Sequence, residues 1–360
     1  MSMIVRRMIG VAAAVALAGA FSGATLSAQE LTKLRIAGPA PVLSATDSII
    51  WHAIPTKLGY YKEEGLDVSY NLSPSLTGSA QSVQSGSAEF GVTNPEVVMQ
   101  VREQGGSLTV FQTLRRANGN EVGVLPESPI QTLADLKGKT IGGVSWGGGG
   151  ALFLTKVLAE MNIGLGDYSR VVTGNGPAAG AALRSKQVDA VILWDSAYAG
   201  LANGGVNLRY ISIPGHEKLA SNSFMATDAY LKNNQETVAK FCRAVAKSYY
   251  FARVNKEAAV KIFLDVNPTM RPASMPVEQA QRDYLNVFTA YIDGAAAGLP
   301  LEAKIGEIED WSWTFTQNFY KGTGMLKGLQ PPEASYTTAF TDRCNDFDRA
   351  KVAAAARAYK

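Results

Sequence analysis

A run of glycines gives this chain its clearest means of holding a ligand. Gly147–Gly150 lies between a predicted strand at 140–144 and a predicted helix at 151–161. Glycine lets a ligand approach the backbone closely, and the free N–H groups at the start of a helix favour an anion. The run lacks the Gly-Lys-Ser/Thr ending of a phosphate-binding loop and the glycine spacing of a dinucleotide loop, so neither is predicted. A flexible loop without a ligand is the alternative interpretation.

Polar and aromatic side chains also follow other predicted strands. In open α/β sheets, ligands bind at the carboxyl ends of the strands. Tryptophan rings at these positions could sandwich a planar ligand, and an arginine could hold a carboxylate or sulfonate through two hydrogen bonds. The predicted ligand-binding residues are Ser44, Thr46, Asp47, Trp51, Ser79, Thr93, Asn94, Arg115, Ser145, Trp146, Gly147, Gly148, Asn175, Trp194 and Asp195.

These residue types also have ordinary structural roles. Serine, threonine and aspartate before a helix are common caps, and Asp47 in particular could cap a helix that runs toward Gly59. Trp51 could equally belong to the core. Arg115 and its neighbour Arg116 could be solvated charges, and the sequence does not say which of the two faces the ligand.

Catalysis and metal binding lack the residues that they need. The chain has two histidines, His52 and His216, and two cysteines, Cys242 and Cys344, all far apart in sequence. Neither a zinc site nor a Cys–His pair is predicted, and no cofactor is expected. In an oxidising compartment the two cysteines can form a disulfide. Two buried free thiols are equally compatible, because the sequence does not give the separation of their Cα atoms.

The first 28 residues predict a secretory signal peptide. Arg6 and Arg7 precede the uncharged stretch Met8–Leu26, and Ala28 supplies a small residue at the cleavage position. An uncleaved membrane anchor is the alternative, because that stretch is nearly as long as a spanning helix. The residues around the arginine pair match a twin-arginine signal poorly, so the Sec route is favoured. With no cysteine near the cleavage site, we expect a free periplasmic protein.

The overall charge argues against a nucleic-acid partner. The chain has 34 Lys and Arg and 31 Asp and Glu. Removing the signal peptide deletes Arg6 and Arg7, which leaves 32 basic and 31 acidic side chains and a net charge of +1. A surface with so little basic excess has no electrostatic footprint for nucleic acid.

Strands and helices alternate over most of the chain, which predicts mostly parallel sheets flanked by helices. Strands are predicted at 34–37, 66–70, 90–93, 108–111, 121–125, 140–144, 170–172, 190–194 and 208–213. From Ala229 onward the sequence predicts helices almost throughout. Two α/β units and a helical C-terminal third suggest two lobes with a cleft between them. We predict lobe 1 at 31–113 plus 222–360 and lobe 2 at 114–221.

Four motifs, in order, resemble the NMT1/THI5-like family, which includes sulfonate-, nitrate- and taurine-type periplasmic binding proteins. The motifs are Gly59–Val68 (GYYKEEGLDV), Gly86–Gly91 (GSAEFG), Leu133–Gly142 (LADLKGKTIG) and Val188–Val191 (VDAV). The resemblance implies a two-lobed type II periplasmic binding fold that closes around a small solute. It also implies an ABC permease in the inner membrane as the partner.

We therefore predict a monomeric solute-binding component of an ABC importer, not an enzyme. The favoured ligand is a small organic anion, an aromatic carboxylate or sulfonate, and the alternatives are a pyrimidine-like vitamin precursor or an alkanesulfonate. Enzymes on this fold resemble the binding proteins but use Cys and His in the cleft, where this chain offers only His52 before residue 200. A sensor subunit that presents its ligand to a membrane receptor remains open.

Overall fold

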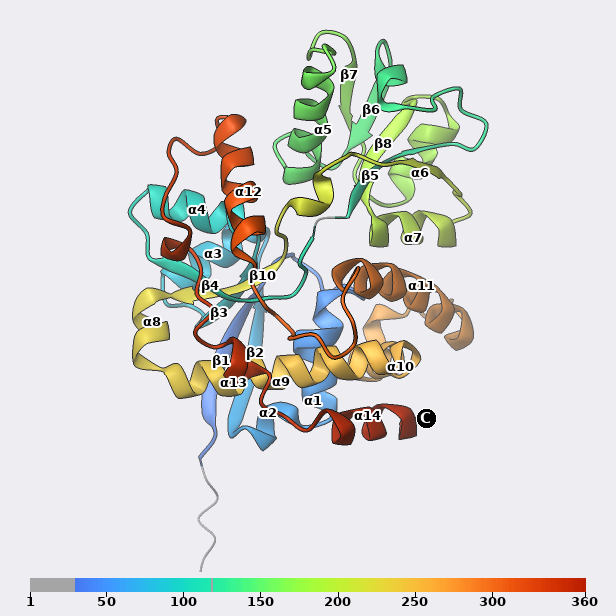
Figure 1. The fold of residues 1–360 in the computed structure, drawn as a ribbon. Helices are drawn as coiled ribbons and strands as arrows, with labels where there is room; N and C mark the ends of the chain where they lie inside the picture. The colour runs from blue at the N-terminus through green and yellow to red at the C-terminus, as the bar shows by residue number, and fades with distance from the viewer. Residues whose placement is uncertain (1–29, 118) are drawn as a thin grey trace, which may run out of the picture. The chain divides into compact units, whose positions relative to one another are not determined.

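Two five-stranded sheets organise the chain (Figure 1). The computed structural model describes residues 30–117 and 119–360, so the predicted signal peptide lies outside the described residues. The first sheet has the strand order β2-β1-β3-β10-β4, in which β10 is antiparallel to both of its neighbours. Its strands are β1 (Thr32–Gly38), β2 (Leu66–Leu72), β3 (Phe90–Thr93), β4 (Leu108–Thr113) and β10 (Ser223–Thr227).

The second sheet repeats this order as β7-β6-β8-β5-β9, with β5 antiparallel to β8 and β9. Its strands are β5 (Asn120–Val124), β6 (Thr140–Gly143), β7 (Ser169–Val172), β8 (Ala190–Trp194) and β9 (Arg209–Ile211). The predicted two-lobed type II fold is confirmed, with one antiparallel strand in each otherwise parallel sheet. The exact lobe boundaries remain a prediction.

Helices connect the strands and make up the C-terminal third. The helices between strands are α1 (Ile54–Lys57), α2 (Tyr60–Glu63), α3 (Leu76–Gln84), α4 (Pro95–Glu103), α5 (Gly149–Glu160), α6 (Pro177–Arg184) and α7 (Asp195–Asn203). Those after β10 are α8 (Asp228–Asn233), α9 (Gln235–Val254), α10 (Lys256–Val266), α11 (Val277–Ala295), α12 (Asp310–Gly322), α13 (Thr341–Cys344) and α14 (Arg349–Ala358). Within the described ranges, no helix is both long and apolar enough to cross a bilayer.

Strand β10 and helix α7 are two elements that the sequence analysis did not assign. All residues of β10 except the last are buried, so Ser223–Thr227 has no alternation of buried and exposed positions to mark it as a strand. It also pairs with segments more than a hundred residues earlier in the chain, which a local pattern does not reveal.

The predicted helix between Asp47 and Gly59 is interrupted, as its internal Pro55 suggested. A π-helical turn at Ile49–Ala53 leads directly into α1, in which Pro55 is the second residue. Gly59 then takes a left-handed conformation with φ 77°, which turns the chain into α2. Gly65 does the same with φ 74° before β2, so both glycines of the GYYKEEGLDV motif make turns that other residues would strain.

Helix α9 anchors the core beside the first sheet. Phe241 stacks on Phe90 with 4.3 Å between ring centres, and it meets Phe224 of β10 edge-on at 5.1 Å. The next residue, Cys242, forms a disulfide with Cys344 of α13, and their Cα atoms lie 5.0 Å apart. The two cysteines are therefore a buried cross-link between helices and not two free thiols.

Two connections join the sheets, one from β4 to β5 and one from β9 to β10. Each connection starts at the carboxyl edge of one sheet and ends at the carboxyl edge of the other. Strand β4 ends at Thr113, level with the end of β3, while β5 starts at Asn120, opposite Trp194 at the end of β8. The return connection leaves β9 at Ile211 and enters β10 at Ser223, opposite Thr93. Both connections therefore run from one carboxyl edge to the other, which is where ligands bind in open α/β sheets.

Candidate ligand-binding site

An ion pair lies at the first connection between the sheets. The guanidinium group of Arg115 donates to both carboxylate oxygens of Asp195, with Nη1–Oδ1 at 3.1 Å and Nη2–Oδ2 at 2.5 Å. Arg115 is only 5% exposed, and its Nε also donates to the carbonyl of Ala117. Asp195 is the first residue of α7 and accepts a hydrogen bond from the backbone N–H of Ser196. The structure thus brings together two predicted site residues, and it pairs them with each other.

The two neighbouring arginines have different surroundings. Arg116 pairs with Glu309, and both of these side chains are about 30% exposed. Arg115 is therefore the arginine that lies at the carboxyl edge of the second sheet, beside the start of α7.

Helix α11 covers this ion pair with residues that the sequence analysis missed. The ring centre of Tyr291 lies 5.6 Å from the guanidinium carbon of Arg115. One turn later, a β-carbon at Gly294 would overlap both Arg115 and Asp195, so only glycine lets the helix approach this closely. The pattern of an amphipathic helix does not distinguish a tyrosine at a site from one in the core, so the sequence held no clear signal for Tyr291.

The hydroxyl group of Tyr291 is buried and has no hydrogen-bond partner in the described part of the chain. Burial raises the pKa of Tyr291 well above its usual value, and the negative charge of Asp47 adds to the effect. The hydroxyl therefore stays protonated, with both its donor and its acceptor capacity unused.

Four predicted residues after β1 form a second polar group. Asp47 accepts hydrogen bonds from the hydroxyls of Thr46 at 3.0 Å and Ser44 at 3.3 Å, and from the indole N–H of Trp51 at 3.1 Å. Asp47 is therefore not the helix cap that the sequence suggested, because its carboxylate is engaged by side chains and not by backbone N–H groups. Trp51 is 1% exposed and packs in the core.

Three further candidates are bonded within or beside the first sheet. The buried hydroxyl of Ser79 donates to the carbonyl of Ala37, and that of Thr93 donates to the carbonyl of Leu76. Asn94 donates to Glu96 at 3.1 Å, and burial raises the pKa of that glutamate. None of these three contacts includes Arg115, Asp195 or Asp47.

The glycine-rich loop lies at the carboxyl end of β6, as predicted. Ser145 and Gly147 are exposed, and Gly148 precedes the first turn of α5. The indole N–H of Trp146 donates to the carbonyl of Val171 at 3.3 Å, and the Arg170 guanidinium carbon lies 5.7 Å from its ring centre. These contacts place Trp146 against β7.

The last two predicted residues also follow strands of the second sheet. Asn175 is exposed in the loop after β7, and Trp194 is half-buried at the end of β8. Trp194 lies opposite Asn120, the first residue of β5, and next to Asp195. The structure thus places Trp194 at the same edge as the ion pair. Whether each of the fifteen residues touches a ligand remains a prediction.

Adding a β-carbon should have different effects at two positions of the glycine loop. A β-carbon at Gly150 would overlap the side chain of Asn120, with Cγ only 2.5 Å away, whereas at Gly147 the nearest atom would be 4.0 Å away. We expect Gly150→Ala to lower the free energy of unfolding by roughly 1–3 kcal/mol, and Gly147→Ala to change it by less than about 0.5 kcal/mol. Urea unfolding of both variants measures this. Equal effects at the two positions would contradict the packing of Gly150 on Asn120.

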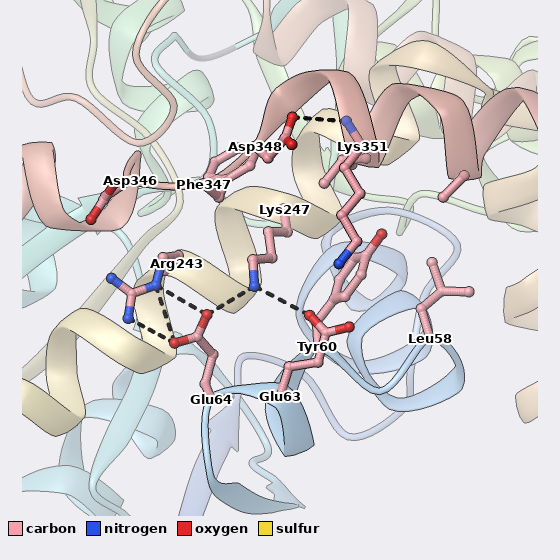
Figure 2. Close-up of a pocket in the computed structure, with 12 residues that line it drawn as sticks. Leu58, Tyr60, Glu63, Glu64, Arg243, Lys247, Asp346, Phe347, Asp348 and Lys351 are labelled. Carbon is pink, nitrogen blue, oxygen red and sulfur yellow. Dashed lines mark hydrogen bonds and ion pairs between the residues drawn. The ribbon is translucent and has the colours of Figure 1, made fainter.

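A separate cavity of about 340 Å³ lies between α2, α9 and α14 (Figure 2). Two of its four acidic residues, Glu63 and Glu64, pair with Arg243 and Lys247, so these four charges are already satisfied. Helix α2 leads into the start of β2, so this cavity lies toward the amino edge of the first sheet. It contains none of the predicted site residues.

Comparisons with known proteins identify a family of binding proteins. A family model described as "NMT1/THI5 like" matches residues 53–259. The riboflavin-binding protein RibY of Chloroflexus aurantiacus is 23% identical over 285 residues, which cover 78% of this chain and 79% of that protein. The formylaminopyrimidine-binding protein of Halalkalibacterium halodurans is 27% identical over 214 residues, 57% of this chain and 63% of that protein.

Solved structures share the fold. The periplasmic aliphatic sulphonate binding protein SsuA from Escherichia coli superposes with a TM-score of 0.63 at 18% identity, covering 84% of this chain and 91% of that one. Each of these three proteins is named for a small molecule or a class of small molecules that it binds, and the three names differ.

Proposed function

Because this chain belongs to the NMT1/THI5-like family, we propose that it is the periplasmic solute-binding component of an ABC importer. It captures a small organic solute between the carboxyl edges of its two sheets and passes that solute to a permease in the inner membrane. It carries out no reaction on the solute.

The observation that carries this proposal is the pair of connections between the sheets. Both connections join carboxyl edges, and the first one carries the buried Arg115 between Asp195 of α7 and Tyr291 of α11. A solute held at these edges would contact residues attached to both sheets. Binding would then favour the arrangement in which the two lobes close on it.

Two observations support a periplasmic location. The disulfide between Cys242 and Cys344 is typical of proteins that fold in an oxidising compartment. The solved relative from Escherichia coli is described as periplasmic. Together with the predicted signal peptide at 1–28, they support export of this chain.

The pairing of Arg115 with Asp195 bears on the class of solute that the site can bind. The sequence analysis favoured an organic anion held by Arg115, but both guanidinium Nη groups of Arg115 already donate to Asp195. An anion could use Arg115 only by displacing that carboxylate or by adding to its negative charge. An anionic solute is therefore the alternative, and a cationic solute is favoured.

A thermal-shift screen tests the binding function. We expect one chemical class among sulfonates, aromatic acids, pyrimidines, flavins and amines to raise the melting temperature, since binding to the folded state alone stabilises it by about 2.7 kcal/mol at a hundred times Kd. The compound should be recovered unchanged after incubation. Consumption of the compound would indicate an enzyme, and the absence of any shift would count against a solute-binding role. Loss of uptake in cells that lack this chain would then distinguish import from sensing.

A further inference from the structure

Two carboxylates lie near the ring of Tyr291, beside the guanidinium group of Arg115. Burial and the charges of Asp47 and Asp195 raise the pKa of Tyr291, and of these two carboxylates only Asp195 is paired with Arg115. Burial and the charge of Asp195 also raise the pKa of Glu121 in β5. Burial lowers the pKa of the nearby His216 to about 4, with the charge of Arg115 adding to the effect, so His216 is neutral at pH 7. Arg116 is bound by Glu309 and contributes no free positive charge.

Asp47 is a buried carboxylate with no cationic partner among the described residues. It is 6% exposed, and within residues 30–117 and 119–360 no lysine, arginine or histidine nitrogen lies within 4.0 Å of it. Its three hydrogen-bond donors, Ser44, Thr46 and Trp51, are all neutral. A buried carboxylate in this state attracts a positive charge or additional strong donors.

Glu121 lies close enough to Asp195 for the two negative charges to repel each other. Burial raises its pKa, and the charge of Asp195 raises it further. A bound carboxylate or sulfonate would add to this repulsion, whereas a protonated nitrogen group would relieve it.

The hydroxyl of Tyr291 is an independent indication of a missing polar partner. It is buried and unpaired among the described residues, on a side chain that is 95% buried, and its ring packs beside Arg115. A buried hydroxyl without a partner is unfavourable, so a ligand group that bonds to it gains affinity. The hydroxyl can accept from an N–H group while Asp47 supplies the balancing charge.

We propose that the solute carries a protonated nitrogen group, an ammonium or amidinium, which binds between the carboxylate of Asp47 and the hydroxyl of Tyr291. This inference rests on the proposed function and specifies the charge of its ligand. The intact Arg115–Asp195 pair stays in place and closes the side of the site next to α7. The face of the amidinium or the methylene groups of the ammonium pack against the Tyr291 ring.

Matched probes of equal shape test the charge directly. Calorimetric titrations of the purified protein would compare benzamidine, benzamide and benzoate, and likewise butylamine, butanol and butyrate. We expect the cationic member of at least one series to bind at least tenfold more tightly than the neutral member, and the anionic member to bind most weakly. An anionic member that binds more tightly, or equal binding within both series, would overturn the proposal.

Three variants test which residues cause the preference for the cationic probe. Asp47→Asn should reduce the affinity for the cationic probe at least tenfold and leave the affinity for the neutral probe within twofold. Tyr291→Phe should reduce the affinity for the cationic probe about threefold. Asp67→Asn is the control, because Asp67 is an exposed acid on β2 outside the site. This variant should prefer the cationic probe over the neutral probe by the same factor as the unmodified protein. A cation preference that survives Asp47→Asn would overturn the assignment to Asp47.

If none of these probes binds, native mass spectrometry of the protein after incubation with bacterial growth extract decides the charge. A retained solute with a protonated nitrogen supports the inference. A retained anion overturns it while leaving the solute-binding function standing. If no solute is retained under any condition, the proposed function itself fails, and this inference fails with it.

Discussion

The double variant Cys242→Ser/Cys344→Ser is expected to lose roughly 2–5 kcal/mol of its free energy of unfolding, the largest loss that we predict for this chain. The disulfide joins residues 102 positions apart, so its removal frees a long loop in the unfolded state. Both cysteines are also buried between α9 and α13, so the serine hydroxyls need hydrogen-bond partners there. We expect the melting temperature to fall by roughly 5–10 °C.

A reductant supplies the matched control for this prediction. The sequence contains only these two cysteines, so dithiothreitol can act on no other disulfide within the chain. Heating with reductant should lower the melting temperature of the unmodified protein toward that of the double variant. The double variant itself should not respond. Equal melting temperatures for the oxidised protein and the double variant would show that the cross-link contributes nothing to stability.

Arg115→Met is expected to lower the free energy of unfolding by roughly 2–4 kcal/mol, since it leaves the Asp195 carboxylate without its cation beneath α11. Asp195→Asn should cost less, because the amide oxygen can still accept from Ser196. The double variant should lose less than the sum of the single losses, with a coupling energy of about 1–3 kcal/mol. Urea unfolding of all four proteins measures this coupling.

The neighbouring pair is the comparison. Arg116→Met breaks the contact with Glu309, whose partners are both partly exposed, so we expect a loss below about 1 kcal/mol. Additive losses at Arg115 and Asp195, or an equal loss at Arg116, would mean that burial under α11 does not strengthen the first pair.

Local pattern was sufficient to predict most of the second sheet and the loops that follow its strands. Strand β8 was predicted at its observed bounds, and the glycine loop was predicted at the end of β6 because alternation and glycine punctuation are both local signals. Strand β10 was missed because its buried residues pair with β3 and β4, which are distant in sequence. The same limit applies to Tyr291, whose role depends on α11 packing beside a connection some 170 residues earlier.

Residue type alone also could not predict which polar groups already satisfy one another. Arg115 and Asp195 were each predicted as ligand contacts, and a sequence does not show that they bind each other. Ser79 and Thr93 were predicted in the same way, but both donate to backbone carbonyls. Hydrogen-bond partners depend on three-dimensional neighbours, so a list of polar residues at strand ends overstates how many are free.

The position of β10 has a consequence for how the chain acquires its structure. All five strands of the second sheet lie within residues 120–211, so this sheet can form from one continuous segment. The first sheet has a gap between β3 and β4 until Ser223–Thr227 has been translocated or synthesised and inserted between them. A chain that emerges from its N-terminus would therefore complete its second sheet before its first. In the interval, the facing edges of β3 and β4 are unpaired, and unpaired strand edges can pair with other chains and aggregate.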